Sequence, residues 1–70
     1  MIDKEDVKNT VRRFNNYLKD TNSRKSYKYD EDENTVIETS KDGSEYKMSP
    51  EKFYRGLRFS GWEFVAEKYQ

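Results

Sequence analysis

The stretch YDEDENTV, residues 29–36, has the residue types most able to bind a metal ion. Oxygen-bearing side chains alternate from Asp30 to Asn34, as they do at the start of an EF-hand calcium loop. A loop of that kind beginning at Asp30 needs Gly at its sixth position, for a sharp turn, and Glu at its twelfth, as the closing ligand. The chain has Thr35 and Lys41 at those positions. We therefore expect no metal site here, and interpret the stretch as a polar turn between two strands.

The acids of this turn are instead candidates for contacting a partner protein with a basic surface. We refer to Asp30, Glu31, Asp32 and Glu33 as the acidic loop. Residues 1–29 have eight Lys or Arg and four Asp or Glu, a net charge of +4; residues 30–51 have two and eight, −6; residues 52–70 have four and two, +2. Two interpretations remain open. Either the segments attract one another when the chain folds, or opposite lobes of charge steer a charged partner.

The chain lacks the side chains on which most catalytic sites depend. It contains no Cys and no His, which removes disulfides, thiolate sites, the commonest general base and the commonest ligand of transition metals. The carboxylates that remain cluster in polar turns, without the apolar neighbours that perturb a catalytic acid. We therefore predict no catalytic residues, no cofactor and no enzymatic activity.

The segment FYRGLRFSGWEF, residues 53–64, is rich in aromatic and arginine side chains. Trp, Tyr and Arg dominate the energetics of protein interfaces because they combine a large contact area with a polar group. If Phe53, Leu57 and Phe64 face the core, the other large side chains point outward. The predicted partner-binding residues of this segment are Tyr54, Arg55, Arg58 and Trp62. For Trp62, burial is the alternative, because a domain with little core needs its largest ring inside.

A basic ridge on the N-terminal helix is a second candidate site. Lys4, Lys8 and Arg12 are spaced four residues apart, with Lys19 beyond them, and such a row suits phosphate contacts. The order helix, three strands, helix is also that of double-stranded-RNA-binding domains, although many unrelated folds share it. Against this function, the acidic loop repels nucleic acid, and a net charge of zero offers little counterion release. Nucleic-acid binding is therefore the alternative function.

The ridge requires an N-terminal helix, which is predicted from Asp3 to Leu18 or Lys19. Asp3 suits the N-cap position, and further acids lie in the first turn, where the helix dipole favours them. One apolar stripe has the helical spacing. Its members are Val7, Val11, Phe14 and Leu18.

Residues 25–48 change to the period of strands. SYKY and EYKM alternate, and TVIET is β-branched. Asp42 and Gly43, between the second and third runs, predict a tight hairpin because Gly readily adopts the positive φ of such a turn. The acidic loop connects the first and second runs. A three-stranded antiparallel meander is the expected arrangement.

The sequence SPE at residues 49–51 marks the start of a second helix, with Ser as N-cap and Pro at the first helical position. The segment after that helix is ambiguous. Ser60 and Glu63 have the spacing of a capping box and favour a short third helix. The alternation of Trp62 and Phe64 is also compatible with a fourth strand. The short helix is the preferred interpretation.

These elements predict an α+β fold. It has an N-terminal helix, an antiparallel meander and a C-terminal helix, followed by the short helix or fourth strand, within a single domain of residues 1–70. The helices are expected on one face of the sheet. The predicted core is Val7, Val11, Phe14, Leu18, Val36 or Ile37, Tyr46, Phe53, Leu57 and Phe64.

The composition sets the broad class of protein. Only 31% of residues are hydrophobic and 40% are charged, so a folded core must rely on the aromatic rings, 16% of the chain. No run is apolar enough to span a membrane, and we expect a cytoplasmic, soluble protein. The predicted function is a small protein-binding module, monomeric or weakly dimeric. We expect a regulator or inhibitor from a bacterium, a phage or another mobile element.

Overall fold

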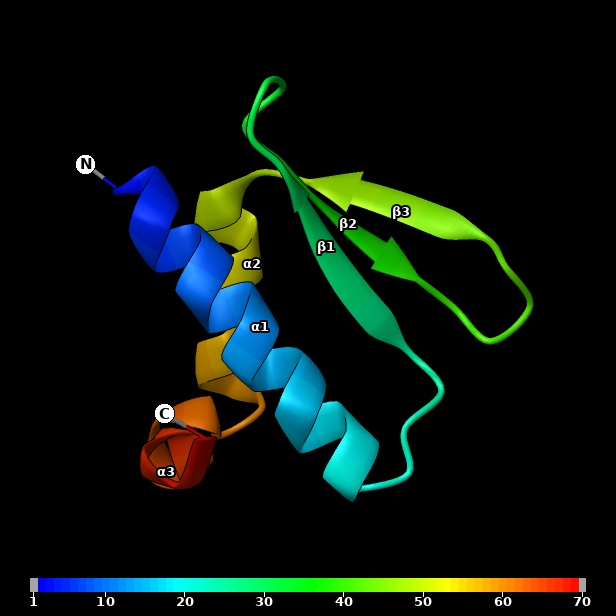
Figure 1. The fold of residues 1–70 in the computed structure, drawn as a ribbon, viewed down its shortest axis with the longest axis vertical. Coiled ribbons are helices and arrows are strands. Elements are labelled where there is room, and N and C mark those ends of the chain that lie inside the picture. Colours follow the sequence, from blue (N-terminus) through cyan, green and yellow to red (C-terminus); the bar gives the residue numbers. More distant parts are fainter. Residues whose placement is uncertain (1, 70) are drawn as a thin grey trace.

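A computed structural model describes residues 2–69 of the chain (Figure 1). The elements lie in the order α1 (Lys4–Asp20), β1 (Ser26–Asp30), β2 (Thr35–Thr39), β3 (Glu45–Met48), α2 (Pro50–Phe59), α3 (Trp62–Val65) and the 3₁₀ helix η1 (Ala66–Tyr69). The three strands form one antiparallel sheet in the order β1-β2-β3. The predicted α+β fold is confirmed, and the segment after α2 is helical, in agreement with the preferred interpretation. The predicted capping box is wrong: Gly61 is the N-cap residue of α3 and no side chain caps that helix, because the Ser60 hydroxyl donates back to the carbonyl of Leu57 at 2.8 Å.

Both long helices begin at the residues that the sequence indicates. The Asp3 side chain caps α1 by accepting a hydrogen bond from the backbone N–H of Glu5, at 3.0 Å. Ser49 caps α2 by accepting from the backbone N–H of Lys52, at 3.2 Å, and Pro50 occupies the first turn. Each cap supplies a partner for an amide that the helix itself leaves unpaired. Local sequence therefore decides where both helices start.

Both connections within the sheet are tight turns. Gly43 has a φ of +89°, and its N–H donates to the carbonyl of Ser40 at 2.9 Å, which confirms the predicted hairpin. The β1–β2 turn ends at Asn34, whose φ of +50° lies in the left-handed region that Asn tolerates. The resulting register places Tyr29 and Met48 on either side of Val36.

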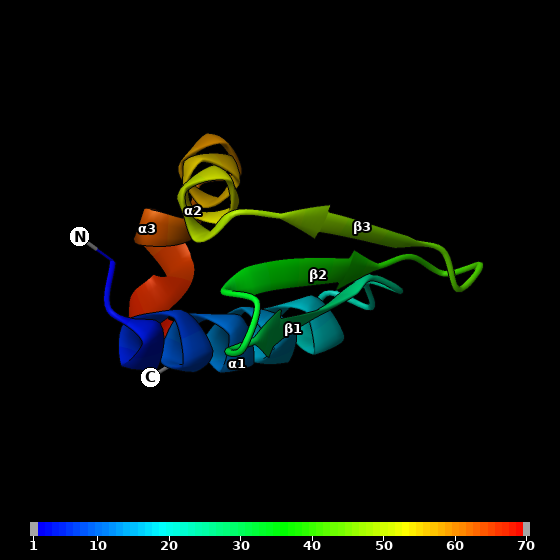
Figure 2. The ribbon, with the colours of Figure 1, turned by 90° about the horizontal axis from the view of Figure 1, so that it is seen from above.

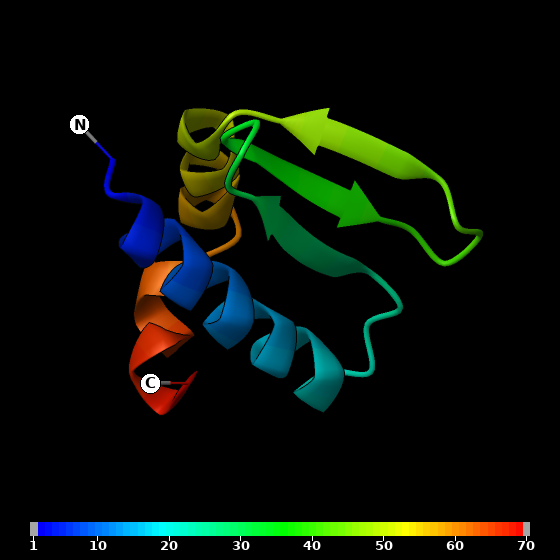
Figure 3. The ribbon, with the colours of Figure 1, turned by 45° about the horizontal axis from the view of Figure 1, so that its top comes forward.

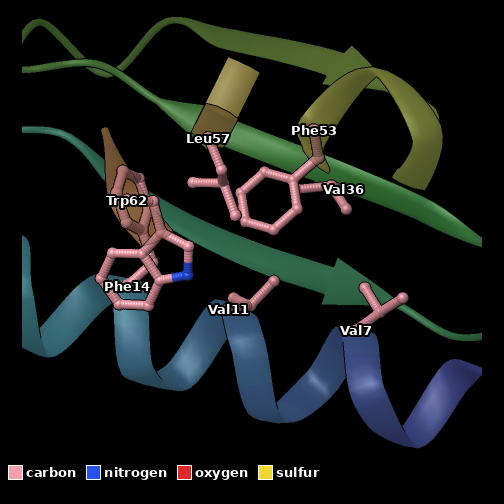
Figure 4. Packing of buried hydrophobic residues seen from close by; sticks show 7 residues of the cluster. All are labelled: Val7, Val11, Phe14, Val36, Phe53, Leu57 and Trp62. Carbon is pink, nitrogen blue, oxygen red and sulfur yellow. The ribbon is translucent and has the colours of Figure 1, made fainter. Parts of the chain in front are cut away.

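The helices cover one face of this sheet. Strand alternation places Tyr27, Tyr29, Val36 and Met48 on the same face, and all four pack in or against the core. In Figure 2, α1 lies alongside β1, and α2 is seen end-on beyond the end of β3. Figure 4 shows Val36 between the side chains of the two helices. The core cluster consists of Val7, Val11, Phe14, Val36, Phe53, Leu57 and Trp62.

The other face of the sheet carries one buried side chain. Ile37 is buried but lies outside the main cluster. Val36 and Ile37, predicted as alternative core residues of β2, are therefore both buried, on opposite faces of the sheet. The cross-strand neighbours of Ile37 are Lys28 and Lys47, whose alkyl stems are long enough to lie against it. Leu18 is half-buried and packs against the main cluster from α1.

Two residues predicted for the core lie outside it. Tyr46 is 49% exposed because β3 is the sheet edge, and α2 contacts β2 more than β3. Phe64 is 82% exposed because Trp62, two residues earlier in α3, takes the inward position. Residues two apart in a helix differ by about 200° in direction, so the two rings cannot both face the core.

Among residues 2–69, no helix is long and apolar enough to cross a membrane.

Candidate functional site

The four predicted contacts of the aromatic–arginine segment divide between the core and the surface. Trp62 is only 8% exposed, so its ring is a core residue and not an outward anchor. It packs edge-on against Phe14 at a centroid distance of 5.2 Å. The guanidinium carbon of Arg13 lies 5.7 Å from the centre of the Trp62 ring. The burial of Trp62 agrees with the alternative interpretation, in which a domain with little core needs its largest ring inside.

Tyr54 connects the two long helices. Its hydroxyl donates to the Thr10 side-chain oxygen at 3.2 Å, and its ring lies 5.7 Å from that of Phe53. The side chain is half-buried, so only part of it is available to a partner. Arg55 and Arg58 are exposed, and neither forms an ion pair within residues 2–69.

A groove of about 500 Å³ brings all four residues together. Tyr54, Leu57 and Trp62 contribute apolar wall, and Arg55 and Arg58 stand among the polar lining. The complete lining is Ile2, Glu51, Tyr54, Arg55, Leu57, Arg58, Trp62 and Glu63. The two arginines are therefore balanced by two glutamates, and the groove itself has no net charge.

Two exposed phenylalanines on the same helices as this groove are not among the predicted contacts. Phe59 at the end of α2 is 87% exposed and Phe64 in α3 is 82% exposed. The helical spacing contains a signal for Phe59: it lies off the Phe53–Leu57 stripe, and it comes four residues after Arg55, on the same face. We refer to Arg55, Arg58, Phe59 and Phe64 as the α2–α3 surface.

A left-handed glycine creates the angle between the two helices of this surface. Gly61 has a φ of +78° and stands between the end of α2 and the start of α3. Its amide donates to the carbonyl of Arg58 at 3.2 Å, and its own carbonyl accepts from the amide of Phe64 at 3.0 Å. The turn thus directs Trp62 into the core and leaves Phe64 outside.

The acidic loop is held by its own carboxylates. One oxygen of the Asp30 carboxylate accepts hydrogen bonds from the backbone N–H groups of Asp32 and Glu33, at 3.1 and 3.3 Å. Glu31 forms an ion pair with Lys8 of α1. Asp32 and Glu33 are exposed, with no ion pair within residues 2–69. Of the four predicted contacts, these two are free to meet a basic partner.

The same contacts occupy half of the basic ridge. Lys8 lies between Glu5, at 3.8 Å, and Glu31. The ammonium group of Lys4 donates to the backbone carbonyl of Glu31 at 3.2 Å. Arg12 and Lys19 are exposed on the rest of the helix. Positive and negative groups therefore alternate where the helical spacing predicts an uninterrupted basic row.

The structure does not bring the acidic loop and the α2–α3 surface together. The loop contacts the first half of α1 through Lys4 and Lys8, whereas η1 contacts its second half through Arg13. Figure 1 shows the loop at the top and α3 at the bottom of the molecule. A partner that contacts both has to extend along much of a body with extents of 30 × 29 × 19 Å.

The titratable group with the largest perturbation lies within the fold. Burial raises the pKa of Tyr27 above its ordinary value of 10.0, and the hydrogen bond to the Glu38 carboxylate, at 2.8 Å, raises it further. Both effects favour the protonated hydroxyl, which donates to Glu38 across the β1–β2 pair. The pair joins β1 to β2 on the face of the sheet that the helices cover.

No protein-family model, curated protein or solved structure matches this chain. Geometry, exposure and charge are therefore the basis for assigning a function.

Proposed function

We propose that this protein is a non-enzymatic protein-binding module whose main contact is the α2–α3 surface. The observation that carries the proposal is the near-complete exposure of Phe59 and Phe64 in a chain so poor in apolar residues. A ring that is more than four-fifths exposed leaves most of its apolar area available for burial against a partner. The two rings stand on α2 and α3, the helices that also supply most of the groove's lining.

The side chains around the rings define the chemistry of the partner. Phe59 and Phe64 require apolar pockets on the partner. Arg55 and Arg58 require carboxylates or carbonyl oxygens, because Arg has donors but no acceptor. Phe and Arg are both enriched in protein interfaces relative to the rest of the protein surface.

The acidic loop provides a second, smaller contact. Asp32 and Glu33 form no ion pair within residues 2–69 and suit a basic patch on the same partner. Their separation from the α2–α3 surface favours a partner that is larger than this chain. A small module that covers such a length of another protein acts by occlusion, as a regulator or inhibitor in the cytoplasm of a bacterium or its phage.

The alternative function, nucleic-acid binding by α1, has less support. Lys4 and Lys8 already contact Glu31, which leaves Arg12 and Lys19 as separate charges. Binding to mixed single- and double-stranded DNA and RNA, measured at about 50 mM and 200 mM salt, tests it directly. We expect no binding at the lower salt. Tight binding that weakens steeply between the two would favour the alternative.

Affinity capture from an extract of the source organism tests the main proposal. Wild-type protein is compared with Phe59→Ser/Phe64→Ser and with Lys19→Ser/Lys41→Ser, a control that alters two exposed residues elsewhere. We expect the same specific protein with the wild type and the control, and its loss with the phenylalanine variant. Circular dichroism and thermal unfolding establish that all three are folded.

Asp32→Asn/Glu33→Gln measures the contribution of the acidic loop to capture. We expect weaker retention of the same protein at low salt and little difference at high salt, because exposed charges are screened. The proposal is wrong if the phenylalanine variant retains the captured protein as well as the wild type does.

A further inference from the structure

The two edges of the sheet differ in how their backbone groups are satisfied. At the β1 edge, the Asn15 side chain closes the strand: its amide donates to the carbonyl of Tyr27 at 2.7 Å and its oxygen accepts from the amide of Tyr27 at 2.8 Å. Helix α1 lies along this strand. A further strand cannot pair with β1 without displacing Asn15.

At the β3 edge the backbone groups point into open space. The amide of Ser40 donates to the carbonyl of Ser44 at 2.9 Å, so the even-numbered residues of β3 face β2. Hydrogen-bonding direction alternates along a strand, and the N–H and C=O groups of Glu45 and Lys47 therefore face outward. Within residues 2–69, no segment lies alongside β3 on this side (Figure 3).

The side chains of this edge are complementary to themselves. In an antiparallel pair of two β3 strands centred on Tyr46, Glu45 stands opposite the partner's Lys47, and Lys47 opposite the partner's Glu45. These positions are hydrogen-bonded pairs, because all four residues have outward-facing backbone groups. Tyr46, already 49% exposed, stands opposite the partner's Tyr46, where cross-strand aromatic rings come close.

Neighbouring registers are less favourable. A shift by two residues places Lys47 opposite the partner's Lys47, or Glu45 opposite the partner's Glu45, and like charges directly opposite repel. A shift by one residue places outward-facing backbone groups opposite inward-facing ones. Charge on an edge strand often prevents pairing altogether. Here one register converts both charges into attractive contacts.

We propose that β3 pairs with β3 of a second copy, to form a symmetric antiparallel homodimer with one continuous sheet. Lys47 has no ion pair within residues 2–69, and the dimer supplies one. Glu45 keeps its own Lys28, at 3.6 Å, and gains the partner's Lys47. Four-residue strands bury little area, so the dimer is weak and forms at high micromolar to millimolar concentration. The β3 edge is separate from the α2–α3 surface, and this inference does not rest on the proposed function.

Sedimentation velocity across that concentration range tests the dimer with a charge swap. Lys47→Glu places acids opposite acids and should weaken association about tenfold or more, whereas Glu45→Lys/Lys47→Glu restores opposite charges and should recover it. Lys41→Glu is the matched control, because it changes the net charge equally at the turn and should leave association unchanged.

Lys47→Pro tests the backbone contact. The Lys47 amide faces outward, so the monomer loses no ladder bond, whereas the dimer loses a hydrogen bond on each side. In the wild type, the amides of Glu45 and Lys47 should gain protection from hydrogen exchange as the concentration rises. A wild-type chain that stays monomeric at millimolar concentration would refute the dimer. So would association that the Lys47→Glu and Lys47→Pro variants leave unchanged.

Discussion

Asn15 and Tyr27 are the polar side chains that connect the helical layer to the sheet. Asn15 projects from α1 and satisfies both backbone groups of Tyr27. Tyr27 in turn donates to Glu38, and its ring lies 5.4 Å from that of Phe14. A small domain can tolerate such polar groups beside its core because each of them has a partner.

Asn15→Ala is expected to lower the free energy of unfolding by about 2 kcal/mol, because it leaves a partly buried amide and carbonyl unpaired. Urea denaturation measures the change. Asn16→Ala is the matched control on the exposed side of α1, with an expected effect within about 0.5 kcal/mol. Equal effects of the two substitutions would mean that Asn15 has no role in positioning β1.

The raised pKa of Tyr27 leads us to expect a loss of stability at alkaline pH. Its folded-state pKa is raised above the ordinary 10.0, so above pH 10 the unfolded chain releases this proton while the folded chain retains it. The contribution is complete below pH 10 and is lost as the pH rises beyond it.

We therefore expect the unfolding free energy to fall more steeply above pH 10 in the wild type than in Tyr27→Phe. Denaturant titrations on either side of pH 10 give the two slopes. The variant keeps part of the slope, because a hydrogen bond to Asp20 also raises the pKa of Tyr69. Identical slopes would contradict the role of Tyr27.

Among the elements, the segment α3–η1 depends most on a single side chain of another helix. Arg13 of α1 donates to the carbonyls of Ala66 and Tyr69, at 2.7 and 2.8 Å. The same guanidinium lies over Trp62. The last turn of a helix frays unless it is held in this way, since its carbonyls have no partners within the helix.

Arg13→Ala is expected to release residues 66–69 from α1 and to cost about 2 kcal/mol of unfolding free energy, because two hydrogen bonds to a charged donor are lost. Amide hydrogen exchange should accelerate in η1 before it does in β2. The neighbouring Arg12→Ala provides the control, since Arg12 is exposed and should change neither quantity. An unchanged exchange rate in η1 would show that the aromatic contacts alone hold the segment.

At the scale of the whole molecule, opposite charges are distributed so that they meet after folding. Ion pairs connect α1 to the acidic loop, through Lys8 and Glu31, and β1 to β3, through Lys28 and Glu45. These pairs are largely exposed and each contributes little stability. Their main consequence is that acidic groups interrupt the basic row of α1 at Lys8. The core, built from seven side chains, supplies most of the stability.

Trp62→Ala and Phe64→Ala separate that core from the surface. Trp62→Ala should cost about 4 kcal/mol, a large part of the stability of a domain this small. Phe64→Ala should change the free energy of unfolding by less than about 0.5 kcal/mol. Thermal or urea unfolding of both variants measures the difference. A large loss with Phe64→Ala would mean that this ring is buried by a contact within the chain.

Most elements of the fold were predictable because their signals are local. The stripe through Val7, Val11 and Phe14 requires only helical spacing, and Gly43 requires only the positive φ of a tight turn. The positions of Trp62 and Phe64 were harder to predict, since their spacing fits either a strand or a helix. A strand would place both rings on one face, whereas a helix places only one of them inward. Four of the groove's lining residues, Tyr54, Arg55, Arg58 and Trp62, were named from the sequence as partner contacts, but the groove itself was not predicted. The exposure of Phe59 and Phe64 was not recognised either.

The sequence alone determined the element order, the N-caps of the two long helices and the hairpin, because each depends on residues within one turn of each other. It also shows that this chain has no thiol and no imidazole side chain. Tertiary structure decided the rest. Tertiary packing buries Trp62 and not Phe64, and it places Glu31 beside Lys8. It also leaves the backbone edge of β3 unpaired, whereas Asn15 pairs with the backbone of β1. Each of these contacts joins segments that are far apart in the chain, so no local sequence pattern predicts it.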